Sequence, residues 1–69
     1  MELIQISLEA ARVNARLTQA SVAEHMHVDR STVRRWEKGE KVPDINECKA
    51  LAELYQLPLD YIFFGKRLA

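Results

Sequence analysis

The chain has 69 residues, of which 48% are hydrophobic, and its ten basic and ten acidic side chains give a formal net charge of zero. A chain of this length holds one domain and leaves little room for a deep enclosed substrate cavity. It lacks both a membrane-spanning apolar run of roughly 18 residues and the basic start and apolar stretch of a signal peptide. We therefore expect a single cytoplasmic domain, spanning residues 1–69, with no contact to a membrane.

The first predicted element is a short helix that begins after Ser7. The preceding residues, 1–6, are compatible with either an extended arm or the start of this helix. Ser7 is a suitable N-cap, because its hydroxyl can accept a hydrogen bond from a free backbone N–H of the first turn. Apolar side chains then recur at helical spacing, and Leu17 is expected to close the element. The recurring residues are Leu8, Ala11 and Ala15.

Two further helices are predicted between Thr18 and Gly39. Thr18 caps the first, which is short, and Asp29 caps the second, where its carboxylate also suits the positive end of the helix dipole. Gly39 occupies the position at which a left-handed C-terminal cap is expected. The expected buried residues of the first of these helices are Val22, Ala23 and Met26.

The last part of the chain predicts a fourth helix and a short fifth one. Asp44 and Glu47 have the spacing of a capping box. Pro58 fits the first turn of the last helix, and residues 65–69 are expected to fray. The expected core side chains here are Ile45, Cys48, Leu51, Ala52, Tyr55, Leu59, Ile62 and Phe63. The chain is thus predicted to be all-α, with five helices and no strand.

The third helix, about residues 30–38, divides its side chains between two faces. Val33 and Trp36 are three residues apart and predict an apolar inner face. Residues 30–41 hold five basic and two acidic side chains, whereas residues 42–64 hold one basic and four acidic. A neutral total therefore conceals a positive region of the kind that meets phosphate. An α-helix fits the major groove of B-DNA, where arginine can pair bidentately with guanine, so this helix is predicted to read DNA.

Residues 17–39 resemble the phage-repressor and Cro-like helix-turn-helix family, also called XRE-type. The likeness is carried by Leu17-Thr-Gln-Ala-Ser-Val-Ala-Glu and Val28-Asp-Arg-Ser-Thr-Val-Arg-Arg-Trp-Glu-Lys-Gly39, and it continues through Pro43-Asp44-Ile45 and residues 57–62. The resemblance implies a compact five-helix fold like that of lambda repressor, with the motif at about residues 18–39. It also implies sequence-specific binding of double-stranded DNA by a transcriptional regulator, more often a repressor than an activator.

The resemblance further implies a role for particular positions. Arg12 and Glu37 match a partly buried salt bridge, which would withdraw Glu37 from the DNA face. Tyr61 and Phe64, expected to be exposed, are candidate contacts of a homodimer that would read a palindromic operator with half-sites about 34 Å apart. The positions that face base edges are Arg30, Ser31 and Arg35. Those that face the DNA backbone are Gln19, Thr32, Arg34, Lys38 and Lys41.

The sequence departs from the family pattern at two positions. His27 lies in the turn between the two motif helices, and Gln56 lies at the end of the fourth helix; both positions usually hold glycine. Because the turn requires a positive φ, which glycine adopts freely, His27 is expected to introduce local strain there.

Other functions for single residues are less favoured by the pattern. Glu24, His25 and His27 could suggest a metal site, but positions two apart diverge on a helix and no further ligand lies nearby. Trp36 and Cys48 lie on apolar stripes and are expected in the core; a nucleophilic Cys48 would lack a base. No cofactor, metal or catalysed reaction is expected. The alternative function is an antitoxin-type or other protein-interaction module with the same fold.

Overall fold

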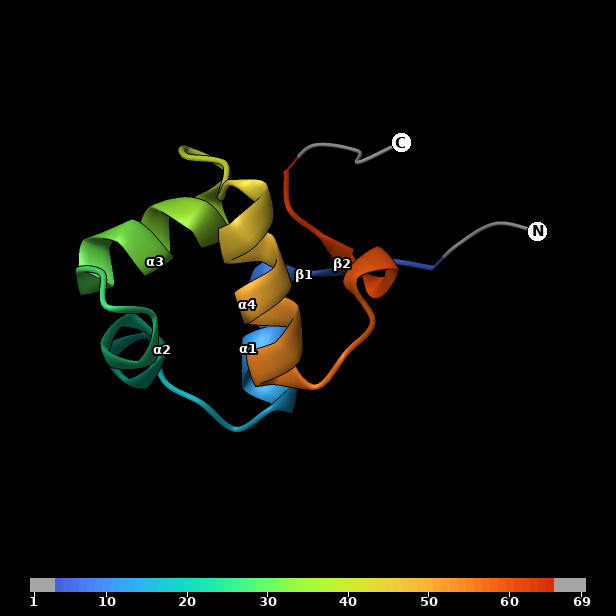
Figure 1. The fold of residues 1–69 in the computed structure, drawn as a ribbon, viewed down its shortest axis with the longest axis horizontal. Coiled ribbons are helices and arrows are strands. Elements are labelled where there is room, and N and C mark those ends of the chain that lie inside the picture. Colours follow the sequence, from blue (N-terminus) through green and yellow to red (C-terminus); the bar gives the residue numbers. More distant parts are fainter. Residues whose placement is uncertain (1–3, 66–69) are drawn as a thin grey trace.

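The computed structural model describes residues 4–65, which form four α-helices, a 3₁₀ turn and a two-stranded sheet. The helices are α1 (Leu8–Asn14), α2 (Gln19–Met26), α3 (Arg30–Lys38) and α4 (Ile45–Tyr55), labelled in Figure 1. A 3₁₀ turn at Leu59–Tyr61 takes the place of the predicted fifth helix, so the count of five helices is wrong. The fraying expected of residues 66–69 lies outside the described residues. Within residues 4–65, no helix has the length and apolar character needed to cross a bilayer.

The helix starts follow the predicted caps, with one exception. The side chains of Ser7, Thr18 and Asp44 each accept a hydrogen bond from a backbone N–H of the first turn at 2.8–3.0 Å. At α4 the Glu47 carboxylate also accepts from the N–H of Asp44 at 2.9 Å, which closes the predicted capping box. Asp29 precedes α3 as predicted, but its side chain makes no capping hydrogen bond. Local side-chain chemistry therefore fixes three of the four starts.

Residues with left-handed backbone conformation end α2, α3 and α4. Gly39 closes α3 with φ 75°, as predicted. His27 and Gln56, the two residues that stand where glycine is usual, have φ 57° and 56° and close α2 and α4. Arg16, with φ 60°, was not expected to adopt this conformation. It lies in the turn after α1, which ends at Asn14 rather than at the predicted Leu17.

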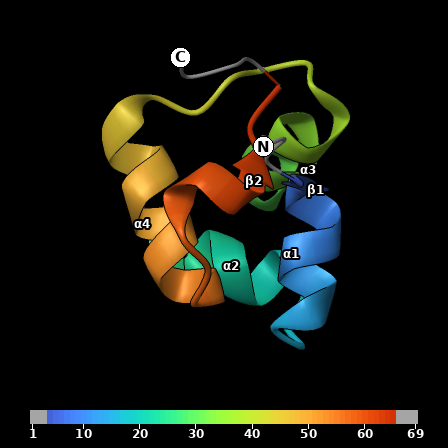
Figure 2. The ribbon, with the colours of Figure 1, turned by 90° about the vertical axis from the view of Figure 1, so that its right-hand side faces the viewer.

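Two short parallel strands join the beginning and end of the described chain. β1 (Ile6–Ser7) pairs with β2 (Ile62–Phe63), and Ile6 lies opposite Ile62. The strands lie beside each other in Figures 1 and 2. Gln5 adds a hydrogen bond from Nε2 to the carbonyl of Asp60 at 3.1 Å. The chain before α1 is therefore extended at Ile6–Ser7, where it forms β1, and the expectation of no strand is wrong.

The core lies between the helices and this small sheet. Figure 2 shows α1 and α4 on opposite sides, with α2 between their lower parts. The hydrophobic core consists of Leu8, Ala11, Val22, Ala23, Val33, Trp36, Cys48, Leu51, Ala52, Tyr55, Ile62 and Phe64.

The exposure of three apolar side chains differs from the prediction. Phe64 is 1% exposed and Phe63 is 44% exposed, the reverse of the prediction. The chain is extended after Tyr61, so residues 62 and 64 share one side and residue 63 points to the other. Ile45, at the first position of α4, was also expected in the core but is 50% exposed.

Candidate DNA interface

α3 presents a continuous cationic face. Val33 and Trp36 are 1% and 2% exposed, so both belong to the core as predicted. At 100° per residue, five exposed side chains fall within an arc of about 140° on the other side of the helix. These five, which we call the cationic face, are Arg30, Ser31, Arg34, Arg35 and Lys38.

The remaining predicted DNA contacts lie around this face. Thr32 is half-buried on α3, and Lys41 is exposed in the loop that follows. Gln19 is the first residue of α2 and is half-buried. The structure therefore places the three predicted base-reading residues, with Arg34 and Lys38, on one surface of one helix.

Glu37, the acidic residue within α3, is turned away from the cationic face. Arg12 and Glu37 form the ion pair that the resemblance implies, with Nε 2.7 Å from Oε2 and Nη2 3.3 Å from Oε1. The Glu37 side chain is 3% exposed and that of Arg12 is 14% exposed. Such a bidentate pair fixes orientation as well as charge. The hydrogen bond to Glu37 raises the pKa of Arg12, and the positive guanidinium compensates the negative charge of the carboxylate.

Gln19 and Leu17 extend this ion pair into a network, whose individual hydrogen bonds were not predicted from the sequence. The Gln19 side chain donates from Nε2 to Glu37 Oε1 at 3.0 Å. Arg12 donates from Nη1 to the carbonyl of Leu17, just before α2, at 3.0 Å. The network thus joins α1, the start of α2 and the last turn of α3. The signal in the sequence was the resemblance, which implied the Arg12–Glu37 pair but not its hydrogen bond with Gln19.

Tyr55 lies on the core side of the same network. It is 3% exposed, and burial together with the Glu37 carboxylate raises the pKa of Tyr55 to about 12. The phenol is therefore neutral at physiological pH. The polar centre of the domain then holds one cation and one anion that compensate each other.

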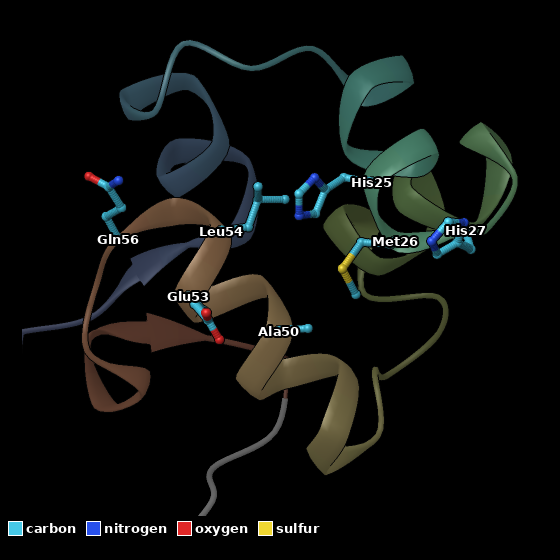
Figure 3. A pocket seen from close by; sticks show the side chains of 7 residues that line it. All are labelled: His25, Met26, His27, Ala50, Glu53, Leu54 and Gln56. Atoms are coloured by element: carbon cyan, nitrogen blue, oxygen red, sulfur yellow. The ribbon is translucent and has the colours of Figure 1, made fainter.

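The two histidines that could suggest a metal site lie at a groove between α2 and α4. His25 and His27 border a shallow, open groove between the end of α2 and α4, together with Met26, Ala50, Glu53, Leu54 and Gln56. In Figure 3 the ring of His25 points toward Leu54, and Met26 lies between the two histidines. Within residues 4–65, no three potential ligands gather closely enough to hold a metal ion.

Cys48 lies in the core, as expected. It is 1% exposed, and its Sγ lies 3.5 Å from the carbonyl oxygen of Pro43. Burial raises the pKa of its thiol, which disfavours the reactive thiolate.

The two candidate dimer contacts, Tyr61 and Phe64, differ in their exposure to solvent. Tyr61 is 50% exposed, as expected, whereas Phe64 is inside the core and cannot reach a partner in this fold. Phe63, the neighbouring residue in β2, is the exposed one. The exposed aromatic side chains at this end of the molecule are therefore Tyr61 and Phe63.

Comparison with known proteins points to one family. A family model described as helix-turn-helix matches residues 8–62. The HTH-type transcriptional activator BcrR of Enterococcus faecalis is 28% identical over 61 residues, which are 88% of this chain and 30% of that protein. The chain thus spans less than a third of the length of this relative. No solved structure matches the chain.

Proposed function

This chain belongs to the XRE-type helix-turn-helix family of DNA-binding transcription regulators, and we propose that it reads a specific sequence by inserting α3 into the major groove. The observation that carries the proposal is the cationic face of α3, backed by a buried apolar face and free of any exposed acidic side chain within the helix. An α-helix with this division fits the major groove. The domain, which we take to extend over residues 1–69, would act in the cytoplasm.

The proposed contacts fall into two classes. Contacts to base edges select the sequence, whereas contacts to phosphate position the protein and carry most of the salt dependence. We assign base edges to Arg30, Ser31 and Arg35. We assign the backbone to Gln19, Thr32, Arg34, Lys38 and Lys41.

We propose repression as the sign of regulation, since occupancy of an operator suffices for it. The relative from Enterococcus faecalis is named as an activator, so activation is the contrary outcome. A reporter placed behind the selected operator distinguishes the two. Lower expression with the protein present supports repression, and higher expression contradicts it.

Selection of bound sequences from a random DNA pool tests the function itself. The expected result is an enriched motif, bound more tightly than random duplex DNA, with an affinity that falls steeply as salt rises. Fluorescence anisotropy with random duplex at about 50 mM salt is the accompanying measurement. Absence of binding under these conditions would contradict the proposal and favour the antitoxin-type interaction module.

We also propose that the protein binds its operator as a homodimer through Tyr61 and Phe63. Both are large, half-exposed apolar side chains at the end of the molecule where the small sheet lies. A twofold dimer reads a palindrome with half-sites about 34 Å apart. Sedimentation with single and double half-site duplexes should show one and two protomers bound; two independent protomers without cooperativity would contradict the dimer.

A further inference from the structure

Glu37 makes more contacts than an ion pair requires. Both of its oxygens accept from Arg12, and Oε1 also accepts from Gln19 Nε2 at 3.0 Å. With a side chain that is 3% exposed, Glu37 cannot itself reach DNA in this fold. Gln19, which is half-buried at the first position of α2, lies between this buried carboxylate and the solvent.

A carboxylate determines which end of a neighbouring carboxamide faces it. Ionised Glu37 can only accept hydrogen bonds, so the Gln19 side chain must direct its NH₂ group, and not its carbonyl oxygen, toward it. The second N–H of that planar NH₂ group diverges from the first. Within residues 4–65 this second N–H has no other partner, so it is available to an acceptor outside the chain.

We infer that Glu37 is a positioning residue, which holds the Gln19 carboxamide so that its second N–H donates to a DNA phosphate. The inference rests on the proposed function, because the phosphate is the acceptor. Ordering a glutamine side chain before binding lowers the entropy cost of the contact. Arg12 neutralises Glu37, so the positioning group does not repel the phosphate that Gln19 contacts.

The variants Glu37→Gln and Glu40→Gln distinguish the effect of positioning Gln19 from the effect of removing a negative charge on DNA affinity. Each removes one negative charge near the cationic face; Glu40 is exposed, and its side chain makes no hydrogen bond within residues 4–65. Charge alone predicts that each variant binds DNA about twofold tighter. Positioning predicts that Glu37→Gln binds about two- to tenfold more weakly, because a glutamine at position 37 can present either end to Gln19. Glu40→Gln should still bind more tightly.

The same substitutions in a Gln19→Ala background separate positioning from general support of α3. We expect Glu37→Gln to lose its weakening effect there. An equal weakening in both backgrounds would overturn the inference, and so would a Glu37→Gln protein that binds as tightly as Glu40→Gln. Anisotropy with the selected operator is the measurement, and circular dichroism checks that each variant is folded.

A measurement on the unmodified protein keeps the inference testable should Glu37→Gln not fold. In ¹⁵N relaxation spectra the side-chain NH₂ of Gln19 should be ordered, whereas that of Gln56, which is exposed and makes no side-chain hydrogen bond within residues 4–65, should be mobile. Equal mobility would overturn the inference. A protein that binds no duplex at all would overturn the proposed function as well; DNA binding with a mobile Gln19 amide would overturn only the inference.

Discussion

At the scale of single residues, the cations of α3 are chemically similar but should act differently on DNA. Arg35→Ala should cost about 1–3 kcal/mol on the selected operator and relax the preference at one base pair. Lys38→Ala should weaken binding to all sequences alike and reduce the salt slope by about one unit. Anisotropy across a salt series, with operator and random duplex, measures both. Equal losses on both duplexes for Arg35→Ala would remove it from the base-reading residues.

The left-handed residues provide a second prediction at this scale. His27→Gly should stabilise the fold by about 0.5–1 kcal/mol, since a left-handed conformation costs a non-glycine residue about 1–2 kcal/mol, partly offset by the freedom of glycine in the unfolded chain. Gln56→Gly should behave in the same way, because its φ of 56° matches the 57° of His27.

His25→Gly is the control for that prediction, because it makes the same substitution within α2 at a right-handed position. It should destabilise the fold by about 0.5 kcal/mol. Urea denaturation compares the three variants. A destabilised His27→Gly would show that contacts of the imidazole outweigh the strain of its backbone.

The conformation and contacts of a single residue were predictable from the sequence where they depend on residues close to it along the chain. The glycine-like turn at His27 follows from its place between two helices four residues apart in the chain. The positive φ of Arg16 had no such signal, since arginine is not typical of the left-handed region. The hydrogen bond from Gln19 to Glu37 joins residues 18 positions apart and depends on how α2 meets α3.

At the scale of elements, two aspartates that precede helices should differ in their contribution. Asp44 accepts a hydrogen bond from the N–H of Glu47 at 2.8 Å, whereas Asp29 makes no capping bond. Asp44→Ala should therefore lower the free energy of unfolding by about 1 kcal/mol. Asp29→Ala should lose only its interaction with the helix dipole, about 0.3 kcal/mol. Thermal or urea denaturation of both variants measures this, and equal losses would contradict the assignment.

The helices themselves were largely predictable because caps and apolar spacing are local. α3 spans the residues expected of the reading helix, 30–38, and α4 begins directly after Asp44. The fifth helix was not predictable: after Pro58 the chain makes a 3₁₀ turn and then pairs with β1. That pairing joins Ile6 to Ile62, and a strand of two residues is too short to show an alternating pattern.

At the scale of the whole molecule, the cationic face and the two paired strands lie in different parts of the domain. The cationic face belongs to α3, which packs mainly against α2, whereas β1 and β2 join the two ends of the described chain beside α1. Figure 1 shows α3 and the strands on opposite sides of α1 and α4. A contact between protomers at the strands would therefore leave both reading helices exposed.

Substitutions of Phe63 and Phe64 test whether protomers meet at the strands, because one of these neighbouring side chains is exposed and the other is buried. Phe64→Ala should cost about 3–5 kcal/mol, as expected when a buried phenylalanine leaves a cavity. A domain of this size has about 3–10 kcal/mol of stability, so this cost removes a large share of it and should lower the melting temperature markedly. Phe63→Ala should change stability by no more than about 0.5 kcal/mol. It should instead weaken cooperative binding to a double half-site and leave binding to a single half-site unchanged. Denaturation and anisotropy on the two duplexes measure these effects, and a Phe63→Ala protein with unchanged cooperativity would show that the protomers meet elsewhere.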